Sequence, residues 1–233
     1  MRTKLTALTV LCATAALGAS LAHAGPVTIA LYTFQSQGDV LAFVKQAGAK
    51  CTKKWSQNMA MRINVGPGTN SCAFRSSVVG DSTDPGSDME ISATAQSSAP
   101  RQLQKKAYVG VGARVSENAG YELRVRPVAR TWQLFRDPKG SAGPSLFRSG
   151  KGKFIRMGAK PNALLLRAFD HGTTSTQLIA TVNGKAVVTA TDGAADQPDG
   201  RRSTVAAGAK GTGPGDGIAG TFDNVAIKVP NPF

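Results

Sequence analysis

YVGVGARVSENAGYELRVRPVARTWQLFRDP, residues 108–138, is the stretch that decides the fold. Apolar residues occupy every second position in segments 109–115 and 121–125, and the short polar stretch SENAG separates the two segments. A period of two is typical of a β-strand with one buried face. The pattern therefore predicts an antiparallel hairpin whose inner face consists of Val109, Val111, Ala113, Val115, Tyr121, Leu123 and Val125.

The opposite face of the second strand is charged, because Glu122, Arg124 and Arg126 alternate with the apolar residues. A third run, residues 131–136, places Trp132 and Leu134 on one side. This predicts an antiparallel sheet with one wet face. Carboxylate and guanidinium groups on that face suit sugar hydroxyls or acidic sugar groups, so these three charged residues are the candidate ligand-binding residues. The alternative is that they only pair with one another.

Further strands are expected about every ten residues along the chain, with glycine-rich turns between them, and this spacing indicates an all-β, two-sheet antiparallel sandwich. Segment 73–79 is expected to pair with segment 59–65. Segment 162–169 is expected to be buried on both faces, and segment 191–220 to be a long loop with at most one short strand at 203–206. The expected strands are 25–29, 59–65, 73–79, 89–93, 146–147, 162–169, 178–182, 186–190 and 221–229.

Two local signals add detail. Asn183-Gly184 tolerates the positive φ angles of a type I′ turn, so it predicts a tight hairpin between its flanking strands. Residues 39–47 have apolar residues at helical spacing, with Asp39 as a candidate N-cap and Gly48 as a stop. One short helix is expected there, although Val40, Phe43 and Val44 also suit a strand.

The first 24 residues have the three parts of a secretory signal: Arg2 and Lys4, an apolar run over 5–17, and Ala22-His23-Ala24 before the cut. A lipid anchor at Cys12 is the alternative, which Leu11 disfavours. Residues 25–233 are then expected to form one β-sandwich domain, secreted to the periplasm or exterior. No later segment approaches the roughly 20 apolar residues of a spanning helix, so no membrane span is expected.

Only Cys51 and Cys72 remain once the leader is removed. An even pair in an oxidising compartment predicts a disulfide. A free or metal-binding pair is the weaker interpretation, because His171 is the only other strong ligand for zinc and carboxylates would have to complete the site.

Removing Arg2 and Lys4 with the leader lowers the formal net charge from +14 to +12. Such an excess favours encounters with anionic partners. The basic residues are scattered rather than massed on one element or interleaved with aromatic residues, which argues against nucleic acid as a partner.

Catalytic constellations are weak in this chain. Asp88 and Glu90 lie two apart on one expected strand, about 6.7 Å along it, and such a spacing is compatible with a glycosidase pair. His171 lies in an expected turn, and no G-x-S-x-G motif supplies a nucleophile for it. The glycines at 211–217 do not form a phosphate-binding loop.

The order GYELRV, WQLFRD, NALLLRAF, LIATVNGKAVV and GTFDNVAIKV, preceded by DMEISA, resembles the concanavalin A-like jelly roll of lectin, glucanase and laminin-G-like domains over about residues 88–229. The resemblance implies two curved sheets with a concave face where relatives bind or cleave polysaccharide. The Glu-x-Asp-x-x-Glu motif of the glucanases is missing. Calcium is possible by the same resemblance, and the candidate ligands are Asp192, Asp196, Asp199, Asp216 and Asp223.

These observations favour a secreted, non-catalytic binding or structural module over an enzyme. Carbohydrate is the favoured ligand class, with an anionic polysaccharide or an envelope glycan among the candidates. The alternative is a glycoside hydrolase of the concanavalin A-like class with an atypical carboxylate site.

Overall fold

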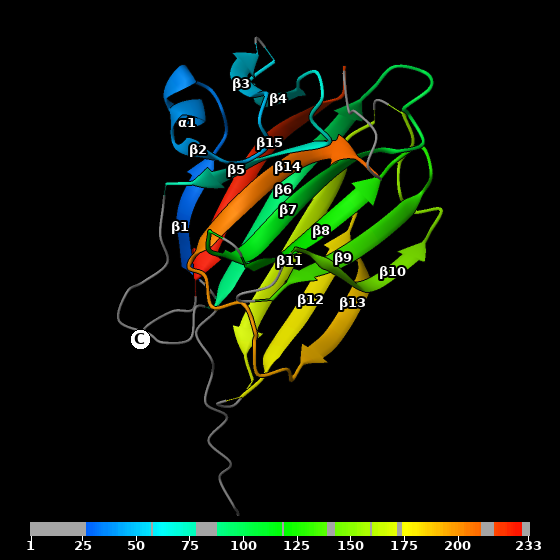
Figure 1. Cartoon of the computed structure of the whole chain (residues 1–233). Coiled ribbons are helices and arrows are strands. Elements are labelled where there is room, and N and C mark those ends of the chain that lie inside the picture. Colours follow the sequence, from blue (N-terminus) through cyan, green and yellow to red (C-terminus); the bar gives the residue numbers. More distant parts are fainter. Residues whose placement is uncertain are drawn as a thin grey trace, which may run out of the picture.

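The computed structural model describes residues 27–56, 58–77, 88–117, 119–138, 143–158, 160–171, 174–210 and 217–229. These residues form two antiparallel sheets that pack face to face, together with one short helix, α1 (Gln37–Leu41) (Figure 1). The all-β sandwich predicted from the sequence is confirmed. The leader and the Cys12 alternative lie outside the described residues.

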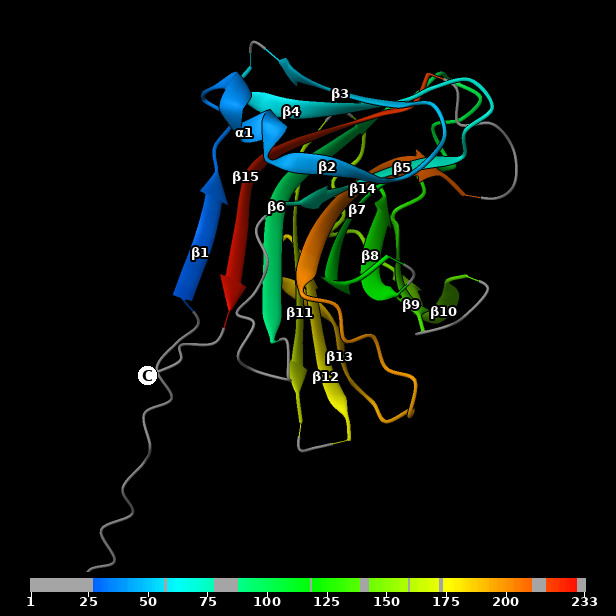
Figure 2. The ribbon, with the colours of Figure 1, turned by 60° about the vertical axis from the view of Figure 1, so that its left-hand side comes forward.

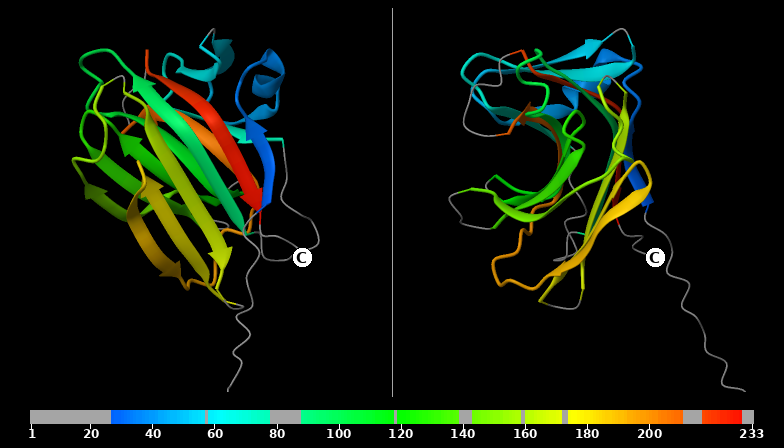
Figure 3. Two further views of the ribbon diagram at one scale, coloured as in Figure 1. Left: turned by 180° about the vertical axis from the view of Figure 1, so that it is seen from behind. Right: turned by 90° about the vertical axis from the view of Figure 1, so that its right-hand side faces the viewer.

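One layer is a seven-stranded sheet. In Figure 3 (right) this sheet is seen as an arc whose concave side faces away from the other layer. Its strands, in spatial order, are β10 (Ser145–Lys151), β9 (Thr131–Asp137), β8 (Gly120–Arg126), β7 (Ala107–Val115), β14 (Arg202–Ala209), β5 (Ser71–Ser76) and β2 (Phe43–Ala47).

The other layer is an eight-stranded sheet, in which β1 (Val27–Tyr32) pairs with the end of β15 (Ala219–Val229), as Figure 2 shows. The path through its remaining strands runs β13 (Lys185–Asp192), β12 (Thr176–Val182), β11 (Asn162–Asp170), β6 (Met89–Ser98), β15, β4 (Ala60–Val65) and β3 (Cys51–Ser56).

The central hairpin has the predicted register up to Ala113. Val115 was expected on the inner face and instead faces the concave side, because Arg114 has a positive φ and its own side chain is buried against Thr176 and Asp170 of the other sheet. Val109, Val111 and Ala113 of β7 stand opposite Val125, Leu123 and Tyr121 of β8, and all six side chains are fully buried. Because side chains alternate across a strand, Glu122, Arg124 and Arg126 must point to the other face. They lie on the concave side and are half-buried there rather than fully exposed.

Strand β14 corrects the expected long loop at 191–220. Its sequence, RSTVAAGA, is made of small residues and lacks an alternating apolar pattern, yet the strand lies between β7 and β5. Val205 and Ala207 join the core, whereas Thr204 and Ala206 face the concave side. The short strand allowed at 203–206 is the middle of β14, and its full length was not expected because its small residues give little hydrophobic periodicity.

The N-terminal third also differs from the expectation. Residues 39–47 divide into the end of α1 and the strand β2, and β3 was not predicted. The expected pairing of segments 59–65 and 73–79 is wrong: β4 pairs with β3 and β15, and β5 lies in the other sheet between β14 and β2. Periodicity defines strands but does not choose their partners.

Strand β11 was expected to be buried on both faces, and this too is wrong. Leu164 and Leu166 are buried in the core, and Leu165 between them is half-buried on the outer face.

The Asn183-Gly184 hairpin is confirmed, since both residues have positive φ and join β12 to β13. In the described residues, no helix has the length and apolar character that crossing a bilayer requires.

A polar network crosses one end of the sandwich. The Tyr121 hydroxyl donates to Asp192 Oδ2 at 2.7 Å, and Arg136 Nε donates to the same oxygen at 2.5 Å. Asp192 belongs to β13, so these contacts join the two sheets. Burial and the neighbouring carboxylate of Asp192 raise the pKa of Tyr121, which keeps the hydroxyl protonated as a donor.

The predicted disulfide is present between Cys51 and Cys72, which are 21 residues apart. Cys51 begins β3 in the eight-stranded sheet, and Cys72 lies in β5 of the seven-stranded sheet. The bond therefore links the two layers at the edge where β2, β3, β4 and β5 meet.

We predict that replacing both cysteines, Cys51→Ala with Cys72→Ala, lowers the free energy of unfolding by about 3 kcal/mol, because a bridge closing a loop of this length restricts the unfolded chain. For a chain of this size the loss corresponds to a melting temperature lower by about 6–12 °C, measured by calorimetry. Thiol titration of the denatured, unreduced secreted protein should find no free thiol. Two free thiols would contradict the assignment.

Candidate functional site

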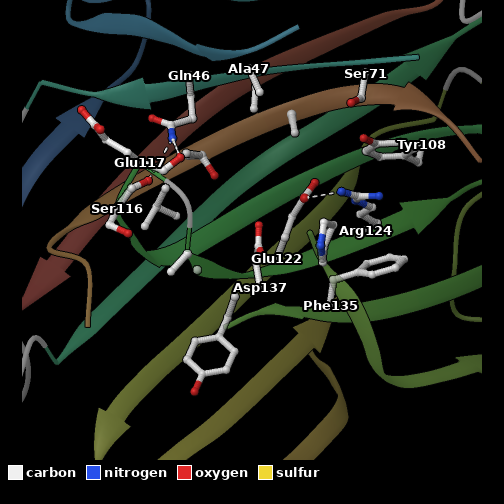
Figure 4. A pocket seen from close by; sticks show the side chains of 18 residues that line it. Gln46, Ala47, Ser71, Tyr108, Ser116, Glu117, Glu122, Arg124, Phe135 and Asp137 are labelled. Atoms are coloured by element: carbon white, nitrogen blue, oxygen red, sulfur yellow. Dashed lines mark hydrogen bonds and ion pairs between the residues drawn. The ribbon is translucent and has the colours of Figure 1, made fainter. Parts of the chain in front are cut away.

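A cavity of about 280 Å³ lies on the concave face of the seven-stranded sheet, and Figure 4 shows it from close by. The side chains around it come from six strands and from the turn between β7 and β8. Those used below are Gln46 from β2, Tyr108 from β7, Glu122 and Arg124 from β8, Phe135 and Asp137 from β9, and Thr204 from β14.

Glycines in β7 let the neighbouring side chains lie over the sheet. A Cβ atom on Gly110 would stand 3.0 Å from Glu122 Oε1, and one on Gly112 would stand 2.3 Å from Thr204 Oγ1. Any larger residue at these two positions would displace those side chains or the adjoining backbone. The alternating glycines of VGVGA therefore position the cavity's carboxylate and hydroxyl groups.

Arg124 is held by three partners. Its guanidinium carbon lies 4.7 Å from the centre of the Tyr108 ring and 4.3 Å from that of Phe135, and Nη2 donates to Glu122 Oε2 at 2.6 Å. Burial, the largest single influence, lowers the pKa of Arg124, but the charge and hydrogen bond of Glu122 together with Tyr108 and Asp137 raise it, so the net shift is upward. Arg124 is thus a fixed positive charge whose planar group is clamped between two aromatic rings.

Two carboxylate oxygens in the cavity have no hydrogen-bond partner within the described part of the chain. They are Glu122 Oε1 and Asp137 Oδ1, and both atoms are buried. Glu122 stands opposite Phe135 and Asp137 opposite Gly120, so the two carboxylates are diagonal neighbours on adjoining strands. Burial first, and then the charge of Glu122, raise the pKa of Asp137, whereas Arg124 opposes the shift.

Gln46 lies at one end of the cavity. Its Nε2 atom donates to the carbonyl oxygens of Ser116 at 2.9 Å and Glu117 at 3.0 Å, which joins the edge strand β2 to the turn after β7 (Figure 4). These residues are 70 or more positions apart in the sequence. Because the sequence predicted a helix over residues 39–47, it gave no reason to place Gln46 here.

The three predicted binding residues have different positions. Glu122 and Arg124 line the cavity, and Arg126 lies on the same strand face but outside the lining. Tyr108, Phe135 and Asp137 were not predicted. For the last two, the alternation within WQLFRD provides the signal, because residues 135 and 137 share the parity of Gln133 and face away from Trp132 and Leu134.

Asp88 and Glu90, the acidic pair considered for catalysis, are not at this cavity. Both belong to the eight-stranded sheet or its border, where Glu90 Oε1 pairs with Lys228 at 2.9 Å and Asp88 Oδ1 accepts the backbone N–H of Asp170 at 2.5 Å. Glu90 is 8% exposed. The structure therefore gives these two carboxylates structural partners far from the concave face.

The aspartates considered for calcium have mostly protein partners. Asp192 and Asp196 both pair with Arg136, and Asp223 accepts the backbone N–H of Asn224. Asp216 lies outside the described residues. Within the described ranges, no group of three or more His, Cys, Asp or Glu side chains is arranged to hold a metal ion.

The raised pKa of Asp137 predicts the direction in which stability changes with pH. The folded state binds this proton more tightly than the unfolded chain, so ionised Asp137 destabilises the fold above its folded pKa, and the penalty vanishes at low pH where both states are protonated. Asp137→Asn should therefore raise the melting temperature at pH 7, and the gain should shrink towards zero near pH 3.5. Thermal melts across this range measure it.

The matched control is Glu117→Gln, which removes an exposed carboxylate from the rim of the same cavity. This variant should have a melting temperature near that of the unmodified protein at every pH in the same range. A gain for Asp137→Asn that stayed constant with pH would mean that the substitution acts through packing rather than through charge.

Comparisons with known proteins identify structures that have a similar fold. No protein-family model and no curated protein sequence matches this chain. Among solved structures, it is similar to the carbohydrate-binding module CBM66 from Bacillus subtilis, with a TM-score of 0.56 and 13% identity over 80% of this chain and 95% of that one. It is also similar to the metal-free carbohydrate recognition domain of Emp46p, with a TM-score of 0.58 and 10% identity over 86% and 94% of the two chains.

A third similar structure is an endo-1,3-beta-glucanase from Streptomyces sioyaensis, with a TM-score of 0.53 and 10% identity over 78% of this chain and 79% of that one. Identities this low show the fold alone. The fold is the jelly roll of concanavalin A-like lectins and glucanases, as the order of strand motifs in the sequence predicted.

Proposed function

We propose that this protein is a secreted carbohydrate-binding module, and that its concave cavity holds an uncharged, hydroxyl-rich part of a glycan. The observation that supports this most is the pair of buried carboxylate oxygens without partners, Glu122 Oε1 and Asp137 Oδ1. Buried acceptors are normally hydrogen-bonded, so a native site that leaves two of them open favours a ligand rich in donors.

Sugar hydroxyls fit these groups chemically. Ionised carboxylates accept strong, charge-assisted hydrogen bonds from hydroxyl groups, and the Thr204 hydroxyl adds a further polar partner nearby. At about 280 Å³ the cavity is at the lower end of the roughly 300–1,000 Å³ typical of small-ligand sites. This size suits a single sugar unit or a chain end.

The local charge argues for an uncharged group inside this cavity. Glu117, Glu122 and Asp137 line it with Arg124 as the opposing cation, and Arg124 is already paired with Glu122. An anion placed here would face an excess of negative charge in a partly buried site. The interpretation that Arg124 and Arg126 directly bind an anionic polysaccharide is therefore less well supported than binding of neutral hydroxyls.

Secretion is part of the proposal and rests on the leader at residues 1–24 together with the Cys51–Cys72 disulfide. Disulfides form and persist in oxidising compartments. The similarity in fold to a carbohydrate-binding module and a carbohydrate recognition domain is compatible with the same assignment. An exterior or envelope glycan is then the partner to test first.

A second candidate function is glycoside hydrolysis, and one observation favours it. Glu122 and Asp137 are diagonal neighbours on adjoining strands, and the pKa of Asp137 is raised, which is the property of a general acid. Diagonal neighbours in antiparallel sheets are about 7–8 Å apart, so their carboxyl groups can reach the roughly 6.5–9.5 Å separation of inverting glycosidases.

Binding is tested on a glycan array followed by calorimetry with the best neutral ligand. We expect Glu122→Gln combined with Asp137→Asn to weaken its affinity by at least about tenfold, because hydrogen bonds to charged acceptors contribute roughly 1.5–3 kcal/mol. Asp223→Asn on the eight-stranded sheet is the control and should bind normally. Unchanged affinity in the double variant would place the ligand elsewhere.

The glycans that bind can also be used to test whether the protein only binds them or cleaves them. Incubation with the protein, followed by chromatography of the products, should show no cleavage if the protein only binds. Cleavage that Asp137→Asn and Glu122→Gln each abolish would establish the hydrolase instead, and the new reducing ends would be counted against the untreated glycan.

A further inference from the structure

A second cavity of about 430 Å³ lies beside the first on the same face of the molecule. The two share Val115, Ser116 and Glu117, the end of β7 and the turn that follows it. The bridge from Gln46 to the carbonyl groups of Ser116 and Glu117 ends at this shared wall. A ligand longer than one sugar unit that leaves the first cavity at this end would meet the second.

Three arginines line the second cavity: Arg75 from β5, Arg202 at the start of β14, and Arg201 just before that strand. Arg75 stands opposite Thr204, so Arg202, two residues earlier on β14, is its diagonal neighbour on the same strand face. Guanidinium groups on adjoining strands can converge on one anion. This arrangement contrasts with the acidic lining of the first cavity.

Two of these arginines have no carboxylate partner among the described residues. Arg75 Nε is buried and has no hydrogen-bond partner, and neither Arg75 nor Arg202 takes part in an ion pair of the described residues. Asp199 and Arg201, which also line the cavity, are both already engaged in interactions. Glu117 lies at the border with the first cavity and is exposed. Arg75 and Arg202 are therefore the groups open to an anion.

The second cavity is also fixed in place by close backbone packing. A Cβ atom on Gly200 would stand 2.2 Å from the carbonyl carbon of Val115 and 2.4 Å from the backbone nitrogen of Ser116. Glycine at this position lets the segment that leads into β14 lie directly on the end of β7. The arginines next to it are thereby held against the wall that the two cavities share.

We propose that this second cavity binds the anionic group, carboxylate or sulfate, of the same glycan whose neutral part occupies the first cavity. The inference rests on the proposed carbohydrate-binding function and specifies its ligand class as an acidic glycan. Arg presents a planar fork of donors that matches carboxylate and sulfate oxygens. The first cavity then binds hydroxyl groups of the glycan and the second binds its anionic group, with Ser116 and Glu117 between them.

The test uses an array of uronic-acid oligosaccharides, each printed beside its carboxyl-reduced form, and sulfated oligosaccharides beside their desulfated forms. We expect the acidic member of a pair to bind roughly tenfold more tightly at low salt, with the preference falling as salt rises. Arg75→Gln combined with Arg202→Gln should remove the preference and leave binding of the neutral member unchanged. The carboxylate and sulfate series separate the two sources of charge.

The matched control is Arg101→Gln combined with Lys185→Gln, which removes the same net charge from exposed positions outside both cavities. It should retain the preference, and thermal melts should show that both double variants are folded. Equal binding of the two members of each pair, or equal losses in the two double variants, would overturn the acidic-glycan inference and leave the proposed function standing.

Absence of binding to every member of the array would overturn the proposed function and the inference together. If the acidic members bound and Glu122→Gln with Asp137→Asn had no effect on them, the arginines would form an independent anion site. That result would also overturn the inference, because it requires both cavities to hold one ligand.

Discussion

The burial of Tyr121, Leu123 and Val125 against the eight-stranded sheet is the constraint on which the rest of the molecule depends. Their three fully buried side chains fix the register of β8 with both of its neighbours. A slip by one residue would bring Glu122 and Arg124 into an apolar core, at a large desolvation penalty. The same constraint places those two residues on the concave face, so the core and the candidate site are two sides of one strand.

On the concave face, the charged group of Arg124 is enclosed by neighbouring side chains. Arg124 has rings on two sides and a carboxylate on a third, so its guanidinium is directed rather than mobile. That arrangement uses up one oxygen of Glu122 and leaves the other open. The face thus alternates between satisfied and open polar groups, which is the pattern expected of a site prepared in advance for a ligand.

The sequence predicted the parts of the structure that depend on local pattern. The β7–β8 hairpin and the Asn183-Gly184 turn follow from alternation and from residues that tolerate positive φ. Only the part of β14 at 203–206 was expected as a strand, because its alanines and glycine have little hydrophobic signal. The partner of β4 was wrong because pairing between distant strands has no local signature.

The candidate site was predictable to the same degree. Glu122 and Arg124 were found because they belong to a strongly periodic strand. Gln46 and Arg202 were not, because they reach the concave face only through the order in which β14, β5 and β2 are added to the sheet. That order is set by packing across the whole sandwich, and no window of sequence contains it.

The bond between Cys51 and Cys72 has a practical consequence for anyone who prepares the protein. It ties down β5, the strand that supplies Ser71 and Ala73 to one cavity and Arg75 to the other. In a reducing cytoplasm the bond would not persist, and this border of the concave face would rely on its hydrogen bonds and on the packing of Phe43 and Phe74 in the core. Material folded in such a host would lack the covalent link beside the candidate site, so an oxidising route of production is the appropriate choice.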